Sequence, residues 1–179
     1  MTAQVFTTVI DSPLGPLSAA ASDHGIHAIG FPEPRHPPVR DAGWRDGTHP
    51  LLDALRARLD AYFAGTLRSF DLPLAPRGTE FQKSVWRALA TIPYGRTASY
   101  AALAAMVGNA GASRAVGAAN GRNPIPIVVP CHRVIGADGS LTGFGGGLPA
   151  KRFLLALEGA LPGGDLLDAA SRPAAAAGR

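Results

Sequence analysis

The chain has 179 residues, of which 46% are hydrophobic and 17% charged, and its formal net charge is +4. This composition predicts a globular protein, built as one domain or as two domains packed together. A single cysteine excludes an internal disulfide and the multi-cysteine zinc sites, and it favours the reducing cytoplasm. Because neither the basic start of a signal peptide nor the ~20 apolar residues of a membrane span is present, we expect no membrane association.

The first 75 residues are expected to form a small α/β domain. Three apolar segments predict the strands of a small antiparallel sheet, at residues 4–10, 17–22 and 25–31. Residues 31–50 are rich in proline and charge and predict a surface loop. Leucine and aromatic residues at helical spacing then predict a helix over residues 50–65. His24 and His27 lack further ligands in the sequence, so we interpret them as ordinary surface residues.

A second domain is expected over residues 79–160, after a linker at 71–78. Apolar spacing predicts four helices, at residues 79–93, 97–109, 112–124 and 149–160. Thr79 and Gln82 have the spacing of a capping box at the start of the first of them. The second and third are short and joined by a glycine-containing turn, which matches a helix-turn-helix.

The remaining segments of this domain are a strand and a loop. Residues 126–130 predict a buried strand, and residues 136–149 a flexible glycine-rich loop. The last segment, residues 161–179, is low in complexity and is expected to be disordered. The fold class is therefore α+β, with a small sheet domain followed by a mainly helical domain.

The positive charge is concentrated in the second domain. Residues 80–160 carry 8 basic and 3 acidic side chains, whereas residues 1–79 carry 7 basic and 8 acidic ones. Such a surface attracts a polyanion, although a solvated positive face without a ligand is an equal alternative. The helix over 112–124 consists almost wholly of small residues. It either packs tightly inside the core or presses Arg114 against a groove of nucleic acid.

Cys131 is a candidate nucleophile. It follows the predicted strand directly, and His132 and Arg133 supply positive charge that would lower the pKa of the thiol. His132 is the only histidine beyond residue 49, so it is the candidate base, and Glu158 could orient it. Neighbouring residues on a strand point to opposite faces, so either the strand has ended or a water bridges the two side chains. The alternative is a lone buried cysteine that acts as a small hydrophobe.

These segments resemble a known family. The stretch NPIPIVVPCHRVIG, the GFGGG loop and KRFLLALEG look like the active-site region of the O6-alkylguanine-DNA alkyltransferases. The resemblance extends upstream through FQKSVWRALATIPYGRTASYAALA and covers about residues 79–160, and residues 9–31 resemble the smaller domain of the family. It implies a ribonuclease H-like N-terminal domain and a C-terminal domain that holds the helix-turn-helix and the reactive cysteine.

The resemblance implies one-shot repair of alkylated DNA. A monomer would bind duplex DNA in the minor groove and flip an O6-methylguanine, or an O4-methylthymine, out of the stack. Cys131 would take the alkyl group and keep it as a thioether. No cofactor is implied, and the zinc-binding cysteines found near the N-terminus of some relatives are absent here.

The implied catalytic residues are Cys131, His132, Glu158, Asn123 and Tyr100. His132 would deprotonate Cys131 through a water, and Glu158 would orient His132. Asn123 would hold the turn before the cysteine, and Tyr100 would sit beside the flipped nucleotide. The implied DNA contacts are Arg114, which would fill the space of the extruded base, and Ala115, Gly117, Ala118, Gly121, Thr97, Ser99 and Tyr94. The implied substrate pocket consists of Tyr100, Arg133, Val134, Phe144 and Gly145.

Two other functions remain open from the residues alone. A cysteine hydrolase would turn over an acyl substrate with Cys131, His132 and Glu158 and would need no basic surface. A regulatory or lesion-binding protein would use the helix-turn-helix alone and would bind DNA unchanged after Cys131→Ser.

One departure from the family generates a prediction about the pocket. Relatives often carry tyrosine, frequently followed by serine, where this chain has Phe144 and Gly145. The extra glycines are expected to widen the pocket and to admit larger alkyl groups. A comparison of transfer rates for benzyl and methyl adducts tests this, and failure to accept benzyl would contradict it.

Overall fold

A four-stranded sheet forms the N-terminal part of the computed structural model, which describes residues 3–34 and 40–161. The strands are β1 (Phe6–Ile10), β2 (Leu17–Ser22), β3 (Gly25–Gly30) and β4 (Arg45–Asp46), in the order β3-β2-β1-β4. The first three pair antiparallel, as predicted. The short β4 pairs parallel to β1, so the sheet is mixed and the segment expected to be loop contributes a strand.

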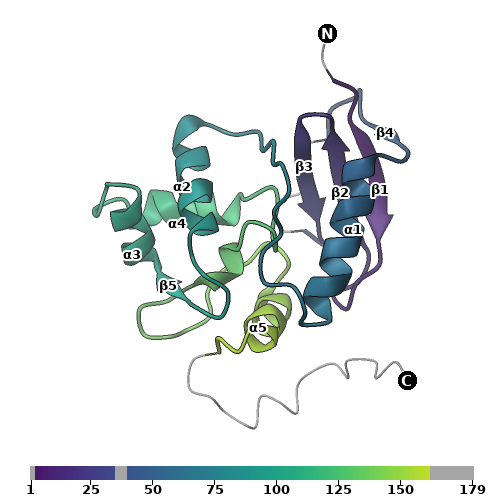
Figure 1. The fold of residues 1–179 in the computed structure, drawn as a ribbon. Helices are drawn as coiled ribbons and strands as arrows, with labels where there is room; N and C mark the ends of the chain where they lie inside the picture. Colours follow the sequence, from purple (N-terminus) through teal and green to yellow (C-terminus); the bar gives the residue numbers. More distant parts are fainter. Residues whose placement is uncertain (1–2, 35–39, 162–179) are drawn as a thin grey trace.

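Helix α1 (Pro50–Phe63) covers one face of this sheet (Figure 1). It begins with proline in its first turn, after His49, whose side chain accepts a hydrogen bond from the backbone N–H of Leu51. Its buried residues recur at helical spacing and are Leu52, Leu55, Leu59 and Tyr62. The predicted helix is confirmed, and its apolar stripe is the side that meets the sheet.

The C-terminal part is mainly helical, as the sequence predicts. Its helices are α2 (Glu80–Ala90), α3 (Tyr100–Met106), α4 (Ser113–Gly121) and α5 (Leu148–Leu157). Both bonds of the capping box between Thr79 and Gln82 are present at the start of α2. Helix α4 packs against α2 and α3, which is the arrangement of a helix-turn-helix (Figure 1). Two short strands that the sequence did not indicate, β5 (Ala98–Ser99) and β6 (Val134–Ile135), pair in parallel.

The predicted strand at residues 126–130 is wrong. These residues form a turn that closes on itself through a bridge between Pro126 and Val129. Ile127 adopts φ 73°, a left-handed conformation that is costly for a β-branched side chain. The turn leads into a single 3₁₀ turn, η1 (Cys131–Arg133). The apolar, β-branched residues here predicted a strand. The pattern of apolar residues does not reveal a tight turn that is held by a side chain.

The two parts share one continuous apolar core that runs from Ile10 to Leu154. The segment expected to be a linker pairs with the start of β3: the N–H of Ile26 donates to the carbonyl of Pro73 at 2.8 Å. Gly25 has φ 137°, and a Cβ there would lie 2.7 Å from the Pro73 carbonyl oxygen, so this close approach requires glycine. The domain boundary at 76–78 stays a prediction, and the expected disordered tail lies outside the described residues except for Leu161. No helix in the described part of the chain is long and apolar enough to span a bilayer.

Candidate active site

Cys131 begins the η1 turn and is 4% exposed. Its backbone N–H donates to the carbonyl of Val129 at 2.8 Å, and the side-chain amide of Asn123 donates to the same carbonyl at 2.8 Å. The Asn123 side-chain oxygen accepts from the N–H of Ile125 at 3.0 Å. Asn123 therefore fixes the strained turn from both sides.

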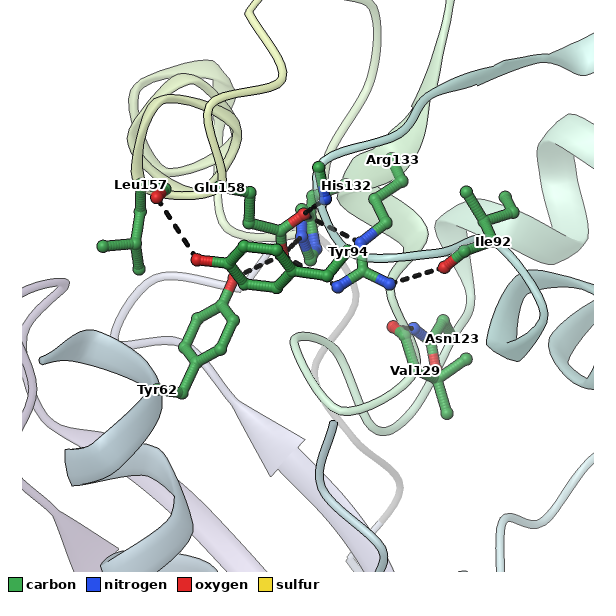
Figure 2. Close-up of polar contacts among 10 residues, drawn as sticks. Tyr62, Ile92, Tyr94, Asn123, Val129, His132, Arg133, Leu157 and Glu158 are labelled. Carbon is green, nitrogen blue, oxygen red and sulfur yellow. Dashed lines mark hydrogen bonds and ion pairs between the residues drawn. The ribbon is translucent and has the colours of Figure 1, made fainter. Parts of the chain in front are cut away.

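The carboxylate of Glu158 is the centre of a buried hydrogen-bond cluster (Figure 2). Its Oε1 accepts from the Tyr62 hydroxyl at 2.7 Å, from His132 Nε2 at 2.8 Å and from Arg133 Nη2 at 3.0 Å. Its Oε2 accepts from Arg133 Nε at 2.8 Å. Burial alone would raise the pKa of Glu158, but the hydrogen bonds from His132, Arg133 and Tyr62 outweigh it and hold the pKa at about 2. Glu158 is thus ionised at every physiological pH.

His132 is held in one orientation by this carboxylate. Because Glu158 is ionised and can only accept, Nε2 must carry the proton that it shares with Oε1. Nδ1 is then the lone-pair nitrogen, and it is buried without a hydrogen-bond partner. Burial lowers the pKa of His132, so the imidazole is neutral at pH 7 and Nδ1 is free to accept a proton. Cys131 and His132 lie in a 3₁₀ turn, so their side chains do not point to opposite faces as they would on an extended strand.

The resting thiol is not activated in the way the sequence suggested. Burial raises the pKa of Cys131 to about 11, and a hydrogen bond with Asn123 and the charge of Lys151 offset only part of that rise. The expected lowering by Arg133 fails because its guanidinium is bound to Glu158 and to the carbonyl of Ile92 at 2.6 Å. Cys131 therefore stays a neutral thiol until a base takes its proton.

Lys151 is a residue of the site that sequence reasoning missed. Its side chain is fully buried on α5, and its ammonium donates to the carbonyls of Val134, Thr142 and Gly143. Burial lowers its pKa to about 8, which still leaves it mostly charged at pH 7. The signal was present, because Lys151, Leu154 and Glu158 recur at helical spacing on the buried face. Lys151 thus holds the glycine-rich loop over the site and attracts a thiolate.

Cys131 lies on the wall of a cavity of about 370 Å³ between the two parts of the molecule. Phe144 and Gly145 of the glycine-rich loop, Asn120 of α4 and residues of β3 also line it. Of the predicted pocket residues, Arg133, Val134 and Tyr100 do not line this cavity. The Arg133 side chain donates hydrogen bonds to Glu158, and Val134 is fully buried in β6. Tyr100 donates instead to the carbonyl of Thr142 at 3.2 Å.

His27 is not the surface residue that the sequence suggested. It lines the same cavity and is 8% exposed. Its Nε2 bonds to the Ser22 hydroxyl at 2.7 Å and its Nδ1 to the carbonyl of Ala75 at 3.0 Å. His24 is exposed, as expected. Within residues 3–34 and 40–161, no three histidine, cysteine or acidic side chains gather closely enough to hold a metal ion.

The helix-turn-helix presents a face of small residues. Arg114, Ala115 and Ala118 on α4 are exposed, and Gly117 and Gly121 are partly exposed, while Val116, Ala119 and Asn120 face the core. Thr97 is exposed, and Ser99 caps α3 by accepting from the N–H of Ala102 at 3.1 Å. Tyr94, predicted as a DNA contact, is partly buried. Its hydroxyl donates to the carbonyl of Leu157 at 3.3 Å, and its ring stacks under the guanidinium of Arg133 (Figure 2).

Fold and site define a class of protein: a helix-turn-helix domain that carries a buried cysteine beside a histidine oriented by a carboxylate. The family model for the DNA-binding domain of 6-O-methylguanine DNA methyltransferase matches residues 80–160. The model for the ribonuclease-like domain of the same family matches residues 5–76. The chain belongs to the 6-O-methylguanine DNA methyltransferase family.

Relatives of this family span nearly the whole chain. The methylated-DNA--protein-cysteine methyltransferase of Methanosarcina acetivorans is 50% identical over 155 residues, which are 87% of this chain and 99% of the relative. The enzyme of the same name from Mycobacterium tuberculosis is 52% identical over 149 residues, covering 83% of this chain and 89% of the relative. The crystal structure of Mycobacterium tuberculosis OGT in complex with DNA matches with a TM-score of 0.81 and 50% identity, covering 86% of this chain and 92% of that one.

The raised pKa of Cys131 predicts the pH dependence of its reaction with iodoacetamide. Because the thiol is protonated below its folded pKa of about 11, the rate should rise about tenfold per pH unit from pH 7 to 10. In protein unfolded in urea the rate should level off near the ordinary cysteine pKa of about 8.5. Intact-protein mass spectrometry measures both, and a plateau below pH 8 in the folded protein would show a thiolate that is already stabilised.

The bond between Tyr62 and Glu158 predicts a specific loss of stability. Tyr62→Phe removes a buried donor to a charged acceptor and should lower the free energy of unfolding by about 1.5–3 kcal/mol. Tyr94→Phe is the matched control, because its partly exposed hydroxyl donates at 3.3 Å to a neutral carbonyl and should cost less than about 1 kcal/mol. Urea denaturation at pH 7 compares the two, and equal losses would show that the bond to Glu158 adds nothing.

Proposed function

We propose that the protein repairs DNA by direct damage reversal, transferring the alkyl group of O6-alkylguanine in duplex DNA to its own Cys131. The observation that carries this proposal is the buried Cys131 at the wall of a cavity, beside a histidine whose free nitrogen is set by Glu158. Relatives of this chain at about half identity are named methylated-DNA--protein-cysteine methyltransferases, and they support the same reaction. Because the single cysteine must remain reduced to react, we place the activity in the cytoplasm.

The reaction consumes the protein. The Cys131 proton passes through a water to Nδ1 of His132, and the resulting sulfur attacks the alkyl carbon. A C–S bond forms as the bond between that carbon and guanine O6 breaks, and the electron pair leaves on the guanine. The proton ends on the guanine, so the products are a thioether and an unmodified base. Glu158 stabilises the transient imidazolium, and Lys151 the transient thiolate.

The high thiol pKa fits this one-shot chemistry. A resting thiolate would react with any alkylating agent or oxidant that entered the cavity, and each such event would waste one molecule. A neutral thiol with an adjacent, pre-oriented base reacts only when a substrate carbon is held in place. The pairing of a pKa of about 11 on Cys131 with a neutral His132 provides this arrangement.

The exposed face of α4 is the proposed contact with the minor groove. Small residues there let the helix backbone approach the groove closely, and the contact needs no base readout. Arg114 at the start of α4 would occupy the space that the flipped base leaves. The Tyr100 ring lies 3.6 Å from the position that a Cβ on Gly117 would take, and the Tyr100 hydroxyl reaches the glycine-rich loop. From there Tyr100 would contact the flipped nucleotide. One monomer with one cysteine is sufficient for the reaction.

Two alternatives predict different products. A cysteine hydrolase would release its product and remain unmodified. A lesion-binding or regulatory protein would retain the duplex and leave the alkyl group on the base. Both require that Cys131 ends the reaction as a free thiol, so the mass of the protein separates them from alkyl transfer.

The deciding experiment is intact-protein mass spectrometry after incubation with excess duplex that contains one O6-methylguanine. We expect one added methyl group on Cys131, in an amount equal to the protein and then no more. Cys131→Ser should bind the duplex and gain no mass. His132→Gln should transfer the methyl group about 10²–10⁴-fold more slowly at pH 7.5, because it lacks the base. Unmodified wild-type protein that retains the duplex would overturn the proposal.

A further inference from the structure

One polar group on the cavity wall takes no part in the proposed alkyl transfer. Asn120 on α4 is 3% exposed, and its side-chain oxygen is buried without a hydrogen-bond partner. A buried amide oxygen without a partner is unfavourable, so its place on a cavity wall points to a ligand group that pairs with it. The same side chain lines the cavity that Cys131 shares with Phe144.

A chain of hydrogen bonds connects Asn120 to Cys131. The N–H of Asn123 donates to the carbonyl of Asn120 at 3.3 Å. The Asn123 side chain donates to the carbonyl of Val129, which also accepts from the N–H of Cys131. Asn120 and Cys131 are therefore joined through two intermediate residues and face one cavity. An alkyl group transferred to the sulfur within this cavity would share its space with the Asn120 side chain.

Several other polar side chains of the cavity wall already have hydrogen-bond partners. Asn123 uses both ends of its amide, His27 both ring nitrogens, and Trp86 donates to the carbonyl of Ala119 at 2.9 Å. Trp44 also lines the cavity and has an unpaired ring N–H, but it belongs to the N-terminal part and packs beside His27. Asn120 is thus a side chain of α4 on the cavity wall whose buried oxygen is open to a new hydrogen bond with an occupant.

An alkyl group that fills the cavity displaces solvent from Asn120. A propyl group leaves the amide unpaired, which costs binding in the transition state. A 2-hydroxyethyl group has the same number of heavy atoms but ends in a hydroxyl. That hydroxyl both donates and accepts, so it pairs with the carboxamide in either of its two orientations.

We propose that Asn120 is a specificity-determining residue that favours transfer of hydroxyalkyl groups over apolar alkyl groups of equal size. This inference rests on the proposed alkyl-transfer function and names the polar adducts as the substrates that the cavity accommodates best. The amide does not contact the sulfur in this role. It recognises the far end of the alkyl chain while Cys131 attacks its first carbon.

The test uses three duplexes, which carry O6-(2-hydroxyethyl)guanine, O6-propylguanine or O6-methylguanine. Single-turnover transfer is followed by intact-protein mass spectrometry, and each rate is divided by the methyl rate of the same protein. The full-length wild type is compared with Asn120→Leu, which replaces the amide by an apolar group of similar shape. Trp44→Phe is the matched control, because it removes the other unpaired polar group of the cavity wall. Asn120→Ala serves as the second variant if the leucine variant does not fold.

We expect wild type to transfer hydroxyethyl about tenfold faster than propyl, and Asn120→Leu or Asn120→Ala to abolish this preference. Trp44→Phe should keep the wild-type ratio. If methyl transfer proceeds and the hydroxyethyl-to-propyl ratio is the same in wild type and the Asn120 variants, the inference is overturned and the proposed function stands. A ratio that changes only in Trp44→Phe would also overturn it. Failure of wild type to transfer methyl would instead refute the proposed function itself.

Discussion

The site depends on one buried carboxylate. Glu158 follows the last turn of α5, and its two oxygens accept hydrogen bonds from side chains of α1 and of the η1 turn. An ionised group buried in a protein is tolerated only when its partners satisfy it, and here hydrogen-bond donors surround it. The same bonds fix the tautomer of His132 and neutralise Arg133. Removal of Glu158 would leave a buried guanidinium unpaired and a histidine without a defined proton position.

The N-terminal part of the molecule is consequently more than a support. Tyr62 of α1 reaches Glu158, and Phe31, just after β3, packs edge-on against Phe144 with ring centroids 5.4 Å apart. A Cβ on Gly146 would lie 2.8 Å from the Phe31 ring, so the glycine-rich loop can pass there only as glycine. A side chain on Gly145 would meet nothing within 4 Å. Gly145 therefore leaves open space in the pocket, whereas Gly146 is required by the contact between the two parts of the molecule.

The sequence predicted what local chemistry determines. The capping box at Thr79, the proline start of α1 and the small-residue face of α4 each follow from residues within one or two turns of helix. The pairing of His132 with Glu158 was also predicted, first from residue chemistry and then from the family resemblance. Tyr62 was not found as part of the site, because its partner is 96 positions away and a tyrosine at helical spacing looks like an ordinary core residue. Lys151 was overlooked although a lysine on the apolar face of a helix is an unusual signal.

The failed strand before Cys131 has a related cause. A run of isoleucine, valine and proline predicts extended structure, because the pattern of apolar residues shows only which side chains are buried. It does not show that the Asn123 side chain competes with strand pairing by forming hydrogen bonds with nearby backbone groups. Its side chain takes the carbonyl of Val129 and the N–H of Ile125, so those groups do not pair with a neighbouring strand. The turn that results forces Ile127 into a left-handed conformation. That strain is held by the surrounding core, and it positions the thiol at the cavity wall instead of inside a sheet.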